Sequence, residues 1–385
     1  MAAFFEFLNY PKIVSGQCSL ENIPAELAGY DAQKPLVVAG TQMAQRGLIK
    51  KFLKAFSDST VVIGAVYDRI SDYAGITQVQ EAADLYRNRG CDAIIALGNG
   101  PVVDAAKAVN VLVSEKTRTL KAYHDGGAFR TAFKPLVVVP SCCFNGWEAT
   151  SMMSVDNHRF TSERLFPQTV IIDARMLKQC HPTCVLESGA ITLLHAYTAL
   201  TSDAANSMAT AMAHTAMRLL CDHWVQGVHP TVTGEALLPL ANAAIISQAA
   251  FFNVGPGLVH LLAEALSKAS GVSIGKLVLA LLPSTLDVVA SKATSVKESL
   301  YLAVVGMEQY AATSSQDRPD KGGAAIRQLI DRVVEGAPPS LKDLKVQEYL
   351  LDKTAREVSA NSNGLFDETQ CLATLTKAWS GDGRQ

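Results

Sequence analysis

The spacing of apolar residues differs between the two halves of the chain. In the first half, short apolar runs rich in β-branched residues alternate with stretches in which apolar residues recur at helical spacing. This alternation predicts a parallel sheet with helices on both faces. The predicted strands are Ile13–Val14, Leu36–Ala39, Val61–Val66, Ile94–Leu97, Leu136–Val139 and Val170–Ile172, with helices such as Met43–Phe56 and Ile76–Arg89 between them.

Beyond about residue 180 the strand-like runs end, and Ala, Leu, Ser and Thr dominate long stretches of helical spacing. We therefore predict an α/β nucleotide-binding domain over residues 1–180 and an all-helical domain over residues 181–385. A ligand cleft between two such domains is the default expectation. The clearest predicted helices are Val185–Ser202, Ser207–Trp224, Gly234–Ala250, Gly257–Ser270 and Ser295–Tyr310, and Thr313–Gly323 is a predicted polar loop.

The composition argues against a nucleic-acid-binding, membrane-spanning or secreted protein. Hydrophobic residues make up 49% of the chain and charged residues 18%, and the net charge of −2 gives no electrostatic reason to expect a nucleic acid. No apolar run reaches the roughly 20 residues that a membrane span needs. The first residues include Glu6 and have no basic start, so they do not resemble a secretory signal. The 8 cysteines show no disulfide framework, which favours reduced thiols and a cytoplasmic location.

The segment from residue 91 to 113 is the most informative in the chain. The apolar run Ala93–Leu97 leads into the turn Gly98-Asn99-Gly100, after which Pro101 opens an alanine-rich helical pattern. Glycines allow a ligand to approach the backbone, and the N–H groups at the start of a helix attract an anion. Pro101 suits a first helical position, where its missing N–H is normally unpaired. Taken alone, the motif is equally compatible with an ordinary strand-to-helix turn.

The residues around this turn resemble a known signature. Gly98-Asn99-Gly100-Pro101, with Asp104 and Lys107, is similar to the Gly-Gly-Gly-Ser-x-x-Asp-x-Ala-Lys motif of the iron-dependent (group III) alcohol dehydrogenase family. The resemblance covers nearly the whole chain and implies that family's architecture, also called dehydroquinate synthase-like. The other similar segments, in the family's order, are Pro11–Gly16, Leu36–Gly40, Val139–Glu148, Ser188–Ala196, Gly257–His260 and Ile274–Lys276.

The resemblance also implies a metal site, but this chain departs from it. The family holds its metal with one Asp and three His. The matching positions here are Ile191, His195, His260 and Ile274. Alkyl side chains cannot coordinate a metal ion, and two histidines alone would hold one poorly. We therefore expect no metal at this site.

Two other interpretations of the histidines stay open. Glu264 lies one turn after His260, so His195, His260 and Glu264 are fallback ligands of the two-His-one-carboxylate type. Alternatively, His195 and His260 exchange protons with a substrate hydroxyl as the catalytic residues. The plainest alternative is that both are core histidines without a chemical role.

This chain retains more of the cofactor-binding residues that the resemblance implies than of the metal ligands. Ser141-Cys142 stands where the family has Thr-Thr, and Phe144 and Trp147 replace a glycine and a serine, so these two aromatic residues and Glu264 are expected to border the substrate pocket. Three interpretations of the two rings stay open: they fill part of the nicotinamide pocket, they stack on a planar ligand, or they simply plug the cleft. Gly40, followed by Thr41, leaves room for a 2′-phosphate, which favours NADP slightly over NAD. The expected cofactor-binding residues are Gly40, Thr41, Gly98, Asn99, Gly100, Pro101, Asp104, Lys107, Ser141 and Cys142.

Together these observations indicate an NAD(P)-dependent oxidoreductase of small alcohols or aldehydes with a degenerate metal site, of weak or altered activity. We expect a cytoplasmic homo-oligomer with no nucleic-acid or membrane partner. The alternative is a catalytically silent paralogue that retains the fold for a structural or regulatory binding role, because chemistry resides in a site rather than in a fold.

Overall fold

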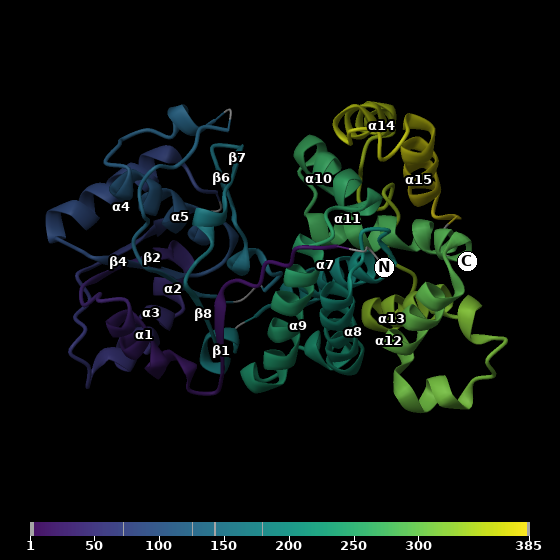
Figure 1. Ribbon diagram of the computed structural model, residues 1–385, viewed down its shortest axis with the longest axis horizontal. Coiled ribbons are helices and arrows are strands. Elements are labelled where there is room, and N and C mark those ends of the chain that lie inside the picture. Colours follow the sequence, from purple (N-terminus) through teal and green to yellow (C-terminus); the bar gives the residue numbers. More distant parts are fainter. Residues whose placement is uncertain (1–3, 72, 125, 142–143, 179, 383–385) are drawn as a thin grey trace. The chain divides into compact units, whose positions relative to one another are not determined.

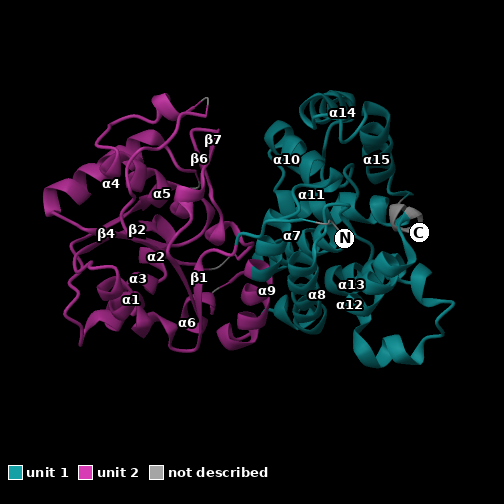
Figure 2. Ribbon diagram, in the orientation of Figure 1, with its two compact units in different colours: residues 1–8, 182–230, 246–385 teal, residues 9–181, 231–245 magenta. Residues whose placement is uncertain are grey.

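The structure, a computed structural model, describes residues 4–71, 73–124, 126–141, 144–178 and 180–382, apart from the side chains of 288–291. It contains two compact units, coloured separately in Figure 2. The α/β unit comprises Asn9–His181 and Thr231–Ile245. The helical unit comprises Met1–Leu8, Pro182–Pro230 and Ile246–Gln385.

The α/β unit is built on a six-stranded parallel sheet, as the alternating pattern predicted. The two central strands, β4 (Ala93–Leu97) and β5 (Leu136–Val139), are apolar and buried along their whole length because helices cover both faces of a parallel sheet. In spatial order the strands are β1 (Lys12–Gly16), β8 (Thr169–Asp173), β5 (Leu136–Val139), β4 (Ala93–Leu97), β2 (Pro35–Gly40) and β3 (Ala65–Ile70).

The strand order reverses between β2 and β4. The chain passes from β2 outward to β3, then returns to the other side of β2 to form β4. Ligands of open α/β sheets bind at such a reversal, outside the carboxyl ends of the strands. Ala39 pairs with Leu97 in the register of these two strands, so Gly40 and Gly98 follow at neighbouring strand ends.

Local departures from the expected elements have identifiable causes. The helix expected over 43–56 is divided by Gly47, which adopts a left-handed φ of +68° and separates α2 (Thr41–Gln45) from α3 (Leu48–Leu53). An unpredicted antiparallel hairpin pairs β6 (Met152–Val155) with β7 (His158–Thr161). The other helices of this unit are α1 (Ile23–Gly29), α4 (Ile76–Arg89), α5 (Gly100–Ser114) and α6 (Ala174–Leu177).

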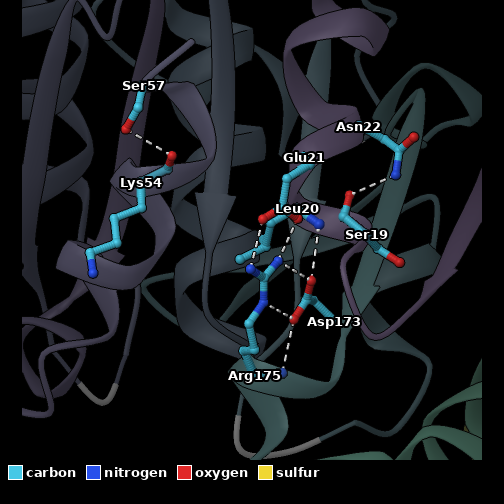
Figure 3. A network of polar contacts seen from close by, with 8 residues as sticks. All are labelled: Ser19, Leu20, Glu21, Asn22, Lys54, Ser57, Asp173 and Arg175. Atoms are coloured by element: carbon cyan, nitrogen blue, oxygen red, sulfur yellow. Dashed lines mark hydrogen bonds and ion pairs between the residues drawn. The ribbon is translucent and has the colours of Figure 1, made fainter. Parts of the chain in front are cut away.

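An ion pair with a buried carboxylate fixes the end of the last strand. Asp173 is fully buried and accepts hydrogen bonds from the Arg175 guanidinium and from the backbone N–H of Leu20 (Figure 3). Arg175 also forms a two-pronged pair with Glu21, with distances of 2.7 and 2.6 Å. These carboxylates raise the pKa of Arg175 further above its usual range. The network ties the segment before α1 to the point where the chain leaves β8.

The second part of the chain is helical, as predicted, and no strand occurs among its described residues (Figure 1). Small residues allow close helix crossings: a Cβ on Gly189 would lie 2.0 Å from the indole Nε1 of Trp224. The helices are α7 (Pro182–Thr201), α8 (Ser207–Gly227), α9 (Gly234–Phe252), α10 (Leu258–Ser270), α11 (Ile274–Leu281), α12 (Thr294–Ala312), α13 (Gly322–Val334), α14 (Tyr349–Asn361) and α15 (Glu368–Ser380).

One described helix, α9, is long and apolar enough to cross a membrane by length and composition alone. Its 19 residues have a mean hydropathy of 1.3 over the relevant window, of which 56% is buried inside the protein. Core helices meet the same criteria, so this is weak evidence for a span.

Candidate functional site

The turn after β4 uses its two glycines for different purposes. Gly98 (φ +153°) lies against α5: a Cβ there would approach the Val102 side chain to 2.9 Å. Gly100 (φ +27°) faces open space, since a Cβ there would meet nothing within 4 Å. Gly98 is therefore required for packing of the helix on the strand, whereas Gly100 leaves the backbone accessible to a ligand.

Side chains of neighbouring segments hold this turn in place. Asn99 precedes α5 in an extended conformation, and its Oδ1 accepts a 2.8 Å hydrogen bond from the backbone N–H of Ser141. The buried Ser141 hydroxyl contacts the Met43 sulfur at 3.2 Å. The turn after β4 and the loop after β5 are thus linked at the carboxyl edge of the sheet. Cys142, also predicted for this site, lies outside the described residues.

Trp147 is fixed over the beginning of α5. Its indole Nε1 donates a 2.8 Å hydrogen bond to Oδ1 of Asp104, and the Arg159 guanidinium lies 5.9 Å from the centre of its ring. Burial raises the pKa of the Asp104 carboxyl to about 6. Phe144, the other aromatic residue expected at the pocket, is only 1% exposed. The aromatic replacement at 147 therefore has a specific polar partner on α5.

Lys107 is a buried cation with local partners. Its ammonium group donates 2.7 Å hydrogen bonds to the carbonyl oxygens of Thr150 and Met152, and burial lowers its pKa. Burial likewise raises the pKa of Glu148 to about 7, and Oε1 of Glu148 has no hydrogen-bond partner among the described residues. Lys107 thus supports the segment that leads into β6, and its expected contact with a cofactor stays a prediction.

A cavity of about 590 Å³ opens beside the first turn of α5. Pro101 and Asp104 line it from α5, and Asp156 and Asn157 line it from the turn of the β6–β7 hairpin. The cavity lies beside the turn at the topological reversal, which is where ligands of open α/β sheets bind. Gly40 and Thr41, the predicted determinants of the 2′-phosphate, lie at the neighbouring strand end.

The helical unit brings His195 and His260 close together. The ring of His195, on α7, stacks on Phe251 of α9 at 4.3 Å between centroids, and lies 5.9 Å from the ring of His260 on α10. His260 Nε2 is 3.3 Å from Oε1 of Glu264, one turn later on the same helix. His195, His260 and Glu264 therefore form one cluster, and Phe251, which no sequence motif indicated, belongs to it.

Burial controls the charge of His195. The residue is 4% exposed, and its Nδ1 has no hydrogen-bond partner among the described residues. Burial first, and then the neighbouring His260, lower the pKa of His195 well below its usual value of 6.5. The imidazole is consequently neutral at physiological pH.

The residues at the implied metal site do not fit the family's ion. Ile191 lies one turn before His195 on α7, and Ile274 is the first residue of α11. Among the described residues, no group of three or more His, Cys, Asp or Glu side chains is arranged to hold a metal. The four family positions offer iron or zinc only two imidazole ligands, because the other two side chains are alkyl groups.

Comparison with known proteins agrees with the fold. The model of the iron-containing alcohol dehydrogenase family matches residues 11–174, and the model of that family's C-terminal region matches residues 186–373. The chain is 26% identical to 4-hydroxybutyrate dehydrogenase of Cupriavidus necator, covering 91% of this chain and 92% of that protein. It is 24% identical to 1,3-propanediol dehydrogenase of Klebsiella pneumoniae, covering 89% and 90%.

Solved structures show the same architecture. A 1,3-propanediol oxidoreductase superposes with a TM-score of 0.86 at 21% identity, over 97% of this chain and 100% of the other. Sulfoacetaldehyde reductase from Bifidobacterium kashiwanohense, solved in complex with NAD+, has a TM-score of 0.84 at 18% identity, covering 98% and 100%. The chain is therefore a member of the iron-containing alcohol dehydrogenase family.

Proposed function

We propose that this protein is an NAD(P)-dependent oxidoreductase that interconverts a small alcohol and its aldehyde without a metal at the family site. The observation that carries the proposal is the turn at the topological reversal, where Gly100 leaves the backbone open in front of α5. The curated relatives include dehydrogenases and reductases of small alcohols and aldehydes, such as NAD-dependent methanol dehydrogenase of Bacillus methanolicus and lactaldehyde reductase of Escherichia coli.

In this proposal the cofactor's phosphates bind at the N-terminal end of α5. A nicotinamide cofactor held there would supply the hydride-transfer chemistry that interconverts the alcohol and the aldehyde. Asn99 and Ser141 hold the turn in shape through their 2.8 Å hydrogen bond. Trp147, fixed by Asp104, provides a rigid aromatic surface at the same edge of the sheet.

The histidines perform the proton transfer in this proposal. Glu264 orients the His260 ring through its 3.3 Å contact with Nε2, so the other ring nitrogen exchanges the proton of the substrate hydroxyl. Neutral His195, whose buried Nδ1 has no hydrogen-bond partner among the described residues, supplies a hydrogen bond to the substrate oxygen. Because Ile191 and Ile274 cannot ligate a metal ion, no Lewis acid polarises the substrate oxygen in this proposal. Hydrogen bonds from the two histidines polarise it instead.

A slight preference for NADP, a cytoplasmic location and a homo-oligomeric state belong to the same proposal. Gly40, at the end of β2, carries no carboxylate that would repel a 2′-phosphate. The preference is tested by titrating the protein with NADPH and with NADH under identical conditions, and an equal or weaker affinity for NADPH contradicts it.

The decisive experiment combines cofactor binding with turnover. Calorimetry with NADPH and NADH, followed by reduction assays on short aldehydes, should show binding and a slow reaction. His260→Gln should lower kcat at least about tenfold without changing cofactor affinity, because general acid–base groups contribute a factor of about 100 or more. Binding of neither cofactor at millimolar concentration would instead support a silent paralogue.

A further inference from the structure

Three charged side chains are buried at α5. Asp104 and Lys107 belong to α5, and Glu148 belongs to the short helical turn Trp147–Ala149, which packs on α5. They are 7%, 1% and 2% exposed, and all three lie in the α/β unit. Fully ionised, they would carry two negative charges and one positive charge. Because an unpaired buried charge is costly, we expect one of the two carboxyl groups to hold a proton.

Lys107 is the charged partner that the two carboxyl groups share. Its Nζ contacts three oxygen atoms, the carbonyls of Thr150 and Met152 at 2.7 Å and the Thr150 hydroxyl at 3.2 Å. An ammonium group has three N–H donors for these acceptors, whereas a neutral amine has two. The acceptors therefore favour the charged form, against the burial that lowers the pKa of Lys107. The charge of Lys107 acts on both Asp104 and Glu148.

The surroundings of the two carboxyl groups decide where the proton lies. Oδ1 of Asp104 accepts a 2.8 Å hydrogen bond from Nε1 of Trp147. The backbone N–H of Ser154 and the charge of Arg159 also favour the ionised form of this carboxyl. Oε1 of Glu148 is buried and has no hydrogen-bond partner among the described residues. Burial raises the pKa of Glu148 to about 7 and that of Asp104 to about 6. The proton therefore lies on Oε1 of Glu148.

Ionisation of Glu148 would disturb the segment 144–150. It would place a second buried carboxylate beside a single ammonium group and leave Oε1 charged, without a donor among the described residues. Trp147 is the adjacent residue, and its carbonyl accepts a 2.9 Å hydrogen bond from the Thr150 hydroxyl, which also contacts Lys107. A displacement of Glu148 is thus transmitted to Trp147 and to its indole hydrogen bond.

We propose that Glu148 is a proton switch for the cavity beside α5. With the proton in place, the segment 144–150 holds Trp147 against Asp104, and without the proton this segment opens. Asp104 connects the switch to the cavity, because it interacts with Lys107 and also lines the cavity.

An anionic ligand in this cavity would bind together with the proton. Asp104 and Asp156 already line the cavity with carboxyl groups. The phosphates of a ligand would add negative charge near the switch and oppose the ionisation of Glu148. The affinity for such a ligand therefore falls as the pH rises through about 7. This effect on cofactor binding rests on the proposed function, whereas the switch itself does not.

The switch is tested on the protein without ligand. In infrared spectra, the carbonyl band of a protonated carboxyl group should be present at about pH 6.5 and lost by about pH 8.5. Glu148→Gln should remove most of this band, and the matched control Glu81→Gln should keep it. Glu81 also accepts a hydrogen bond, from the Tyr67 hydroxyl at 2.8 Å, but Glu81 is exposed.

Fluorine NMR of protein labelled with fluorotryptophan follows the movement of the segment. The chain has 3 tryptophans, and Trp147→Phe assigns the resonance of Trp147. This resonance should shift over the same pH range in the wild type and stay fixed in Glu148→Gln. Asp104→Asn is a second variant, in case Glu148→Gln does not fold. It leaves Lys107 to Glu148 alone, so the loss of the band should move to lower pH, which a merely structural role would not produce.

Calorimetry with NADPH connects the switch to binding. In two buffers of different ionisation enthalpy at about pH 7.5, the wild type should take up protons on binding and Glu148→Gln should not. The Kd of the wild type should weaken by up to about tenfold per pH unit above about pH 7, the limit for one linked proton.

The outcomes separate the switch from the proposed function. If NADPH does not bind while the infrared band and the Trp147 resonance titrate as expected, the switch stands and the proposed function fails. If the band persists in Glu148→Gln, or the Trp147 resonance does not respond to pH, the switch is wrong. Equal proton uptake by the wild type and Glu148→Gln would refute the coupling to ligand binding.

Discussion

The turn Gly98–Gly100 and the histidine cluster respond differently to sequence change. At the turn, Asn99 and Pro101 stand where the family motif has its second glycine and its serine, and both suit the conformation of their positions. Asn99 has an extended backbone that any residue adopts, and Pro101 lies in the first turn of α5, where a missing N–H costs no helical hydrogen bond. Gly98 and Gly100, which need positive φ, are the two that remain.

At the histidine cluster, metal binding would depend on side-chain ligand atoms, so we expect two replacements to be enough to remove it. Ile191 and Ile274 keep the helices and their packing but contribute no ligand atom. A site made of backbone tolerates substitution at its extended and helical positions, whereas a site made of side chains does not. This contrast is the basis for expecting cofactor binding without metal binding.

The largest expected effect concerns the reaction itself. Metal polarisation of the substrate oxygen is worth several kcal/mol, and each 1.36 kcal/mol is a factor of about ten in rate. Reduction of simple short aldehydes by this protein should therefore be slower than metal-assisted reduction by about three orders of magnitude, and chelators should not change it. Rapid turnover that a chelator abolishes would show that the interpretation of the two isoleucines is wrong.

The second prediction tests the turn. Gly100→Val places a branched side chain in the open space before α5 and should weaken NADP(H) binding at least about 100-fold, measured by calorimetry. Gly90→Val is the matched control, since Gly90 also has positive φ (+60°) and an open Cβ position but ends α4 away from the turn. Equal losses in the two variants would mean that backbone strain, not ligand approach, is responsible.

The contrast between periodic elements and individual backbone positions also explains which parts of the fold could be predicted from the sequence. The buried parallel strands and the long helices were predictable because they have strong hydrophobic periodicity. The β6–β7 hairpin was missed because its strands have only four residues each, and its turn relies on positive φ at Asp156 and Asn157. The division of the 43–56 helix at Gly47 was missed because an isolated glycine does not reveal its φ.

Contacts between distant segments were the least predictable part of the site. The sequence marked Trp147 and Asp104 separately, but not the hydrogen bond that joins them. Phe251 is one apolar residue among many on α9, and only its stacking with His195 distinguishes it. Local patterns identify which residues carry chemistry, whereas the folded chain decides which of them meet.

The third prediction restores the missing ligands. Ile191→Asp combined with Ile274→His should create a site for zinc or iron beside His195 and His260. At a free metal concentration of 100 times the Kd, binding would stabilise the fold by about 2.7 kcal/mol, visible as a rise in Tm that a chelator reverses. The unaltered protein should contain no stoichiometric metal by elemental analysis. About one metal ion per chain would contradict the expectation that Ile191 and Ile274 abolish metal binding. The single variant Ile274→His, which lacks the carboxylate, is the control and should respond less.

The smallest effect is a pH dependence that reports the charge of His195. Burial keeps its pKa in the folded state well below the usual 6.5, so below that pH the unfolded chain binds a proton that the folded chain does not. The stability contribution is therefore complete above pH 6.5 and is lost as the pH falls, by up to about 1.4 kcal/mol per pH unit.

His195→Phe keeps an aromatic ring against Phe251 but cannot titrate. Urea unfolding of both proteins at pH 7.5 and pH 5.5 should show the variant losing less stability on acidification than the wild type. An identical loss in the two proteins would mean that His195 is protonated in the folded state, supported by Glu264, and the proposed division of roles between the two histidines would have to be reversed.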